Sequence, residues 1–199
     1  LESGEDDRTW DAGIVIDDHK CDVFLDFETD ANGNALPAGT IIDNEYAGFG
    51  IMISATGGSN LAMIFDTDNP TGGDPDLGSD DLGNVLIISE DGDQGDPDDN
   101  AGSGVLTFKF DQLYDVNEMD FKDIEESGGF VRTYDAAGNM IGTISIPAIG
   151  NATEQTISVD AEDVARMEVH FAGSGAIDNI CLSNSDTAAL GDRVWLDSN

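Results

Sequence analysis

The chain has 199 residues, which is room for one full domain of roughly 150 to 200 residues and excludes two large domains. Apolar residues make up 39% of the chain, so it can bury a core and is not a disordered acidic tail. Its 42 acidic residues stand against 7 lysines and arginines, and the net charge of -35 argues against binding to nucleic acid or to an anionic membrane surface.

Apolar and polar residues alternate from residue 22 onward with the period of two that is typical of a half-buried β-strand. The alternating segments are 23–27, 49–53, 106–110, 119–121, 144–146, 157–159 and 167–171. Segments 61–65 and 85–89 are apolar almost throughout, which predicts central strands covered on both faces. About ten short strands without crossover helices predict an all-β fold, an antiparallel β-sandwich of the jelly-roll type.

The segments between the predicted strands are rich in Asp, Asn and Gly, which tolerate turn conformations. Residues 134–140 predict a β-hairpin with a short loop that contains glycine. The only plausible helical turn is 161–165, which is too short to change the fold class.

Two segments, 66–81 and 90–100, hold acidic residues at high density among glycines and prolines. Because glycine and proline interrupt regular secondary structure, neither segment is expected to form an ordinary helix or strand. Calcium (Ca2+) takes roughly six to eight oxygen ligands from carboxylates, amides and main-chain carbonyls, and a tight acidic loop presents these groups together. The sequence therefore predicts calcium in the loops, with a merely solvated charge run as the alternative. The predicted ligands are Asp66, Asp68, Asp74, Asp76, Glu90, Asp96, Asp98 and Asp99.

These loops do not follow the EF-hand pattern. An EF-hand loop that began at Asp66 would have glycine at its sixth position and glutamate at its twelfth, where this chain has Thr71 and Leu77. Any calcium site here is therefore specific to these loops.

The two cysteines lie at opposite ends of the predicted sandwich in sequence, Cys21 at the start of the first strand and Cys181 inside the last. The first and last strands of a closed sandwich can be neighbours, so the pair is either a disulfide or two separate buried thiols. A disulfide that closes so long a loop would stabilise the fold by about 5 kcal/mol in the chain-entropy model.

Few residues point to catalysis. Neither His19 nor His170 has a nucleophile motif beside it, and no cysteine or histidine cluster has the spacing of a zinc site, so we do not expect an enzyme. Arg132 is one of few cations and is a candidate contact for a carbohydrate or a carboxylate, or else it neutralises an acidic face.

Exposed aromatic rings often serve as stacking platforms for sugars. The candidates here are Tyr46, Phe49 and Tyr114, with ordinary core or edge packing as the alternative for each.

Both ends of the chain resemble parts of a known repeat. Residues 7–15 resemble the closing strand, and residues 190–199 the opening strand, of the B-type repeats in bacterial serine-aspartate-repeat surface adhesins. This resemblance implies that residues 1–15 are the tail of an upstream repeat module and that 187–199 begin a downstream B-type repeat. The domain between them, 16–186, is then the calcium-binding β-sandwich.

Four short segments of this central domain resemble secreted or surface-anchored bacterial proteins with a galactose-binding-like jelly roll. They are 23–28, 65–77, 134–139 and 173–180. The resemblance implies a non-catalytic ligand-binding module with a structural calcium between its first and last strands. That calcium site would use Asp26 or Glu28 together with Asp178.

Together these features lead us to expect a calcium-dependent extracellular module of a bacterial surface adhesin. Its partners would be a glycan or short peptide on another cell or surface and the adjacent domains of the same chain. We expect neither a nucleic-acid partner nor membrane insertion, because no apolar run approaches the roughly 20 residues that span a bilayer. The alternative is a structural spacer, stiffened by calcium, that binds no ligand.

Overall fold

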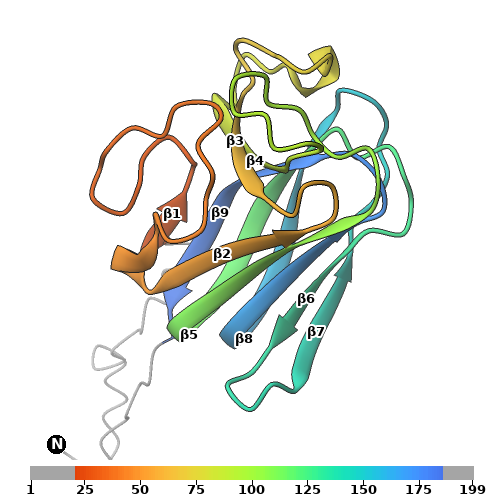
Figure 1. Cartoon of the computed structure of the whole chain (residues 1–199). Coiled ribbons are helices and arrows are strands. Elements are labelled where there is room, and N and C mark those ends of the chain that lie inside the picture. The colour runs from red at the N-terminus through yellow and green to blue at the C-terminus, as the bar shows by residue number, and fades with distance from the viewer. Residues whose placement is uncertain (1–20, 186–199) are drawn as a thin grey trace, which may run out of the picture.

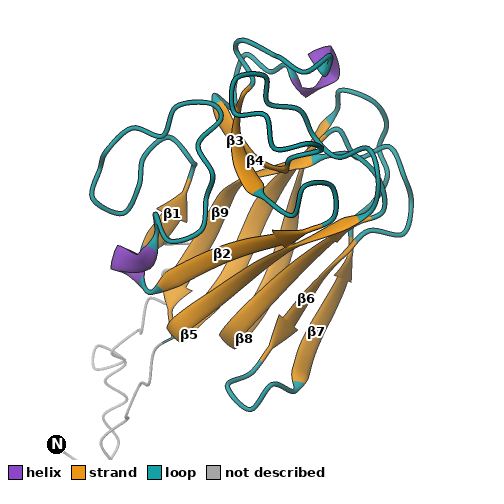
Figure 2. Ribbon diagram, viewed as in Figure 1, coloured by secondary structure: helices purple, strands orange, loops and turns teal. Residues whose placement is uncertain are grey.

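The computed structural model describes residues 21–185, and almost all of its regular structure is β-strand (Figures 1 and 2). The repeat fragments predicted at 1–15 and 187–199 lie outside these residues. The strands are β1 (Val23–Leu25), β2 (Ile51–Thr56), β3 (Ala62–Asp66), β4 (Asn84–Ile88), β5 (Gly104–Lys122), β6 (Phe130–Tyr134), β7 (Met140–Ser145), β8 (Glu154–Phe171) and β9 (Ala176–Asn184). Two single 3₁₀ turns, η2 (Ala47–Phe49) and η3 (Pro75–Leu77), interrupt the loops. No helix in the described part of the chain could cross a lipid bilayer.

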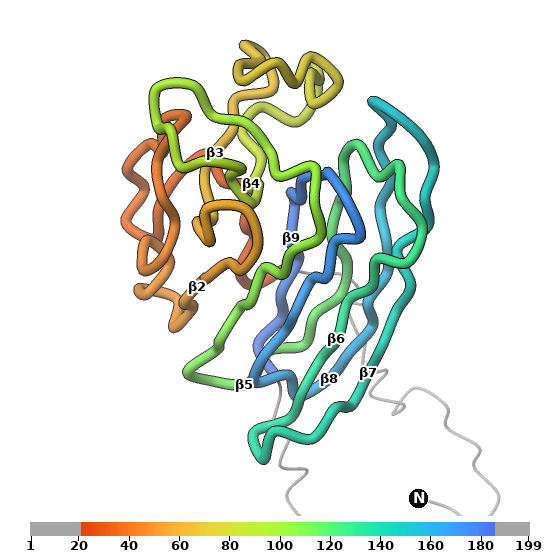
Figure 3. The backbone as a smooth tube through the Cα atoms, turned by 45° about the vertical axis from the view of Figure 1, so that its right-hand side comes forward, coloured from red at the N-terminus to blue at the C-terminus, as the bar shows by residue number. Residues whose placement is uncertain are grey.

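The fold is an antiparallel β-sandwich of the jelly-roll type, organised by one long ribbon. Strands β5 and β8 pair from Gly104 opposite Phe171 to Lys122 opposite Glu154, and their register shifts between Lys109 and Tyr114. There the ribbon folds over, so that its two halves lie in two different layers (Figures 1 and 3). Strands that pass from one sheet to another through such irregularities are a common way to close a sandwich.

One layer contains β2, the first half of β5, the second half of β8, β6 and β7. The other contains the remaining halves of β5 and β8 together with β9, β4, β3 and β1. Apolar side chains from both layers meet between them in one core. Residues 106, 108 and 110 illustrate the predicted alternation, because all three are buried while Lys109 between them is exposed.

The helical turn predicted at 161–165 is wrong, because this segment is the corner of β8. Asp160 and Asp163 adopt left-handed backbone conformations, with φ of 47° and 56°. Asp163 N donates a hydrogen bond to Asp115 Oδ1 at 2.9 Å, which fixes the corner against β5. The hairpin predicted at 134–140 is confirmed by β6, β7 and a turn in which Asn139 N donates to Asp135 Oδ1 at 2.8 Å.

Strands β3 and β4 are buried on both faces, as their apolar sequences predicted. β4 lies between β3 and β9, but β3 ends the strand order, so its predicted central position is wrong. Its outer face is covered instead by the acidic loop that follows it. Leu77 of that loop is fully buried against Phe65 and Val85 in a second, smaller core.

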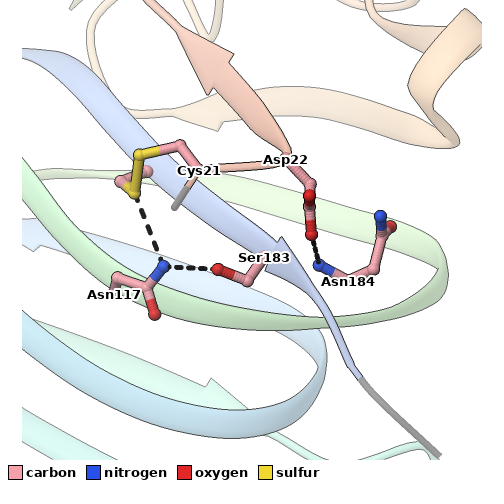
Figure 4. Close-up of a disulfide and its surroundings, with 6 residues drawn as sticks. Cys21, Asp22, Asn117, Ser183 and Asn184 are labelled. Carbon is pink, nitrogen blue, oxygen red and sulfur yellow. Dashed lines mark hydrogen bonds between the residues drawn. A yellow bond between two sulfur atoms is a disulfide. The ribbon is translucent and has the colours of Figure 1, made fainter. Parts of the chain in front are cut away.

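Cys21 and Cys181 form a disulfide, with their Cα atoms 5.1 Å apart (Figure 4). It lies beside the β1–β9 pairing, where Val23 is opposite Leu182. Asn184 N also donates to Asp22 Oδ2 at 2.9 Å. The two ends of the described chain are therefore joined side by side.

Candidate functional site

Asp178 on β9 is the polar side chain whose surroundings most clearly call for a partner. The register between β5 and β9 shifts near it, and the next residue, Asn179, has φ of 52°, so a bulge places Asp178 in the interior. The Asp178 side chain is only 1% exposed, and both of its carboxylate oxygens lack a hydrogen-bond partner. A buried carboxylate in this condition is costly unless a proton or a cation neutralises it.

Other carboxylates add to this cost. Burial, together with the nearby charges of Asp120, Asp26 and Glu28, raises the pKa of Asp178 to about 8, although the backbone N–H of Asn179 opposes the shift. Tyr46 is 2% exposed, and its hydroxyl also lacks a partner. Burial, followed by the charges of Asp26 and Asp178, raises the Tyr46 pKa as well. Negative charge thus converges on one buried point between the start of β9 and the residues after β1.

The segment after β1 presents its two carboxylates in a fixed geometry. Phe27 between them has φ of 55°, which turns the chain sharply. Asn84 N and Nδ2 donate to the two Glu28 carboxylate oxygens at 2.6 and 3.1 Å, and Glu28 N donates to Asp26 Oδ1 at 3.2 Å. Asp26, Glu28 and Asp178, which the resemblance implied as calcium ligands, therefore lie in one region.

The side chains of this region do not by themselves make a metal site. Among residues 21–185, no three His, Cys, Asp or Glu side chains form a group that could hold a metal ion by themselves. Calcium routinely completes its coordination with main-chain carbonyls and amide oxygens, whereas zinc depends mostly on side chains. A calcium site that used Asp178, Asp26 and Glu28 would therefore need main-chain carbonyl or amide oxygens as further ligands.

The two acidic segments of the sequence lie against each other above β3 and β4 (Figure 1). We call residues 66–83 and 90–100 together the acidic double loop. Thr71 Oγ1 donates to Pro97 O, Gly72 N to Asp96 Oδ1, and Asp99 N to Asp74 Oδ2, each at 2.8 Å. A Cβ on Gly72, which has φ of 66°, would overlap the Asp98 side chain, so only glycine allows this approach.

The predicted loop ligands divide into two groups. Asp66 accepts hydrogen bonds from Asp68 N and from Asn69 Nδ2 at 2.9 and 2.8 Å, so this pair belongs to a local turn. The others lie close enough together that the charge of one carboxylate raises the pKa of another. They are Asp74, Asp76, Glu90, Asp96, Asp98 and Asp99.

Within the second group, Asp98 and Asp99 are the most perturbed. Burial, followed by Asp91 and Glu90, raises the pKa of Asp98, and its Oδ1 is buried without a partner. Burial raises the pKa of Asp99 to about 7, although Gly175 N donates to its Oδ2 at 2.5 Å and opposes the shift. This part of the loop is a second place where positive charge would be stabilising.

In the presence of chelator, we expect stability to fall as pH rises from about 5 to about 7. The folded pKa values of Asp99 and Asp178, about 7 and about 8, exceed the ordinary value of 3.8. The folded state therefore keeps protons that the unfolded chain has already lost. One such proton corresponds to about 1.4 kcal/mol per pH unit. Urea unfolding across this range measures the slope, and a flat or rising stability would contradict it.

A cleft of about 420 Å³ lies between η2 and the corner of β5. Its lining combines polar groups with one partly buried ring: Val23, Gly48, Phe49, Gly50, Asp111, Gln112, Tyr114 and Asn184. Tyr114 is 1% exposed and donates through its hydroxyl to Phe49 O at 2.7 Å, and Tyr46 is equally buried. Both tyrosines are core residues, so their prediction as stacking platforms is wrong, while Phe49 remains at the cleft.

No protein-family model matches this chain, and comparison with curated proteins gives no match. Among solved structures, the lectin domain of lectinolysin in complex with Lewis B antigen is 12% identical, with 44% of this chain and 70% of that chain covered and a TM-score of 0.33. TmCBM61 in complex with β-1,4-galactotriose is 13% identical, with 66% and 88% covered and a TM-score of 0.37. The enzymatically active domain of bacteriophage CBA120 tailspike protein 4 is 18% identical, with 67% and 19% covered and a TM-score of 0.36. Likenesses at such low TM-scores carry no argument about a ligand.

Proposed function

We propose that this domain is a calcium-dependent, non-catalytic binding module of an extracellular bacterial surface adhesin, with a glycan or short peptide as its ligand. The observation that carries the calcium dependence is the buried Asp178 carboxylate, which has no partner on either oxygen and lies near Asp26 and Glu28. A calcium ion would supply the positive charge that this carboxylate lacks.

The protein's own contacts explain how such an ion would order the domain. Asp178 belongs to β9, Asp26 and Glu28 follow β1, and Glu28 is bonded to Asn84 at the start of β4. An ion at this point would therefore tie together three strands of one layer. The acidic double loop, with its partnerless Asp98 Oδ1, is the proposed place for further calcium.

The cleft beside η2 is the proposed ligand site. Asp111, Gln112 and Asn184 offer carboxylate and amide groups that can bond sugar hydroxyls or peptide groups, and Phe49 adds an apolar edge. A few convergent polar groups with an aromatic neighbour are typical of small-ligand sites. Val23 links this cleft to β1, and thus to the segment that carries Asp26 and Glu28.

One observation favours the spacer alternative. The disulfide between Cys21 and Cys181 joins the two ends of the described chain across 160 residues of sequence. Tension applied through the chain would pass across this bond and leave the sandwich between the two cysteines unloaded. Such a bond suits a module whose role is to withstand force.

Glycan and peptide arrays, probed with calcium and with chelator, separate the two functions. The binding module is expected to give signals with calcium that chelator abolishes, and Gln112→Ala in the cleft is expected to weaken them about tenfold, as for a lost polar contact to the ligand. Binding that persists in chelator would contradict the calcium dependence. A folded, calcium-loaded domain that binds nothing on either array would favour the spacer.

A further inference from the structure

The layer that contains β2 and β6 is almost free of acidic residues, in a chain whose net charge is -35. Its paired segments are β2, 104–110 of β5, 166–171 of β8, β6 and β7, and Glu168 is the one acid in them. We call the solvent side of these segments the outer face. In the described part of the chain, three of the four lysines and arginines lie on it, together with a histidine. They are Lys109, Arg132, Arg166 and His170.

Glu168 is already neutralised by its neighbours. Arg166 Nη1 lies 3.2 Å from Glu168 Oε1, and His170 Nε2 lies 3.1 Å from Oε2. The Tyr134 hydroxyl donates to Glu168 Oε2 at 2.9 Å. The Glu168 carboxylate is therefore already paired and does not neutralise Lys109 or Arg132.

Arg132 forms no ion pair with any residue between 21 and 185. Its guanidinium carbon lies 4.3 Å from the centre of the Phe130 ring, and Phe130 in turn stacks on His170 with ring centres 4.2 Å apart. Its Nε is buried and has no hydrogen-bond partner. A guanidinium stacked on an aromatic ring can bind a planar carboxylate through two parallel hydrogen bonds from its terminal nitrogens.

We propose that the outer face binds an anionic carbohydrate with isolated carboxylates, such as a chain of uronic acids, with Arg132 as the carboxylate contact. This inference rests on the proposed glycan-binding function and adds a second site, separate from the cleft beside η2, with an anionic class of ligand. Because the chain has a net charge of -35, it would repel a densely charged polyanion, so we expect a ligand whose carboxylates are widely spaced. Arg132 lies opposite Thr143 on β7 and opposite Glu168 on β8, and Thr107 on β5 lies opposite Glu168. The two threonine hydroxyls suit the neutral part of a sugar.

Titration calorimetry of the calcium-loaded domain tests this with three short ligands: trigalacturonic acid, its methyl ester and galactotriose. The acid is expected to bind at least about tenfold more tightly than the ester, because only the acid can pair with the guanidinium. Arg132→Gln is expected to remove that difference without lowering the melting temperature. Glu162→Gln, which changes one charge at the exposed β8 corner, is the matched control and is expected to leave binding unchanged.

Equal binding of acid and ester, or unchanged binding of the acid by Arg132→Gln, would overturn the inference. Equal binding of a short glutamate peptide would do the same and would point to an acidic protein partner. Calcium-dependent binding of galactotriose alone would overturn this inference and leave the proposed function standing. Binding of the acid that survives chelator would support the outer face and contradict the calcium dependence instead.

Discussion

Asp178→Asn is expected to abolish the stabilisation that calcium gives to this domain through the β1–β9 region. The substitution keeps the shape of the side chain but removes the charge that a buried calcium ion would balance. Calcium at about 1,000 times its dissociation constant stabilises a folded domain by about 4 kcal/mol per site. For a domain of this size that corresponds to a rise of about 8–16 °C in melting temperature. Scanning calorimetry with calcium and with chelator measures the rise in both proteins.

The same experiment separates a lost ligand from a damaged fold. In chelator at pH 8, Asp178→Asn is expected to be at least as stable as the native domain, because it removes a buried carboxylate that has no partner. Glu162→Gln again controls for the loss of one charge and is expected to keep the full calcium response. A full calcium response in Asp178→Asn would remove this carboxylate from the calcium account.

Asp98→Asn distinguishes the two proposed locations of calcium. The buried Oδ1 of Asp98 lies in the acidic double loop, on a different segment from Asp178. If both places bind calcium, each single variant is expected to retain part of the rise in melting temperature and the double variant to retain almost none, because distant sites contribute additively. An unchanged response in Asp98→Asn would restrict calcium to the β1–β9 region.

Period-two alternation was sufficient to predict most of the strands, because each layer has one face in the core and one in solvent. It failed where tertiary pairing overrides local preference. Residues 106–110 and 119–121 belong to one strand, since the exposed residues 111–113 between them form the corner of the folded ribbon. Residues 161–165 read as a helical turn, but in the structure they form the irregular corner of β8, which pairs with β5. Neither corner has a sequence signal of its own.

The candidate calcium site was accessible only through resemblance. Glu28 and Asp178 are far apart in a chain with 42 acidic residues, so composition cannot single them out. The high density of acidic residues is sufficient to predict the acidic double loop. It does not distinguish Asp66, which accepts a hydrogen bond in a local turn, from Asp98, which has a buried oxygen without a partner. That distinction depends on which backbone amides the folded loops bring near each carboxylate.

The outer face carries a sequence signal that is visible only across several segments. Four of its segments, 51–56, 104–110, 130–134 and 140–145, contain no Asp or Glu at all. Arg132 by itself does not reveal this surface, because the segments become neighbours only when the strand order is known. In a chain this acidic, acid-free strands are informative once they are found to be neighbours.

Removing the disulfide by Cys21→Ala together with Cys181→Ala is expected to destabilise the domain by about 5 kcal/mol, because the bond closes a loop of 160 residues in the unfolded chain. The expected fall in melting temperature is about 10–20 °C. Alanine is preferred to serine because Cys181 is buried and a hydroxyl there would add a cost of its own.

Reduction of the native domain provides an independent measurement, since it breaks the same bond without any substitution. The reduced protein and the double variant are expected to melt at similar temperatures. Calcium should recover part of the loss in both, because an ion held by Asp178 with Asp26 and Glu28 would join β9 to the segment after β1 through a second connection. If both forms melt within a degree or two of the oxidised native domain, pairing between β1 and β9 already holds the ends together and the disulfide adds no stability.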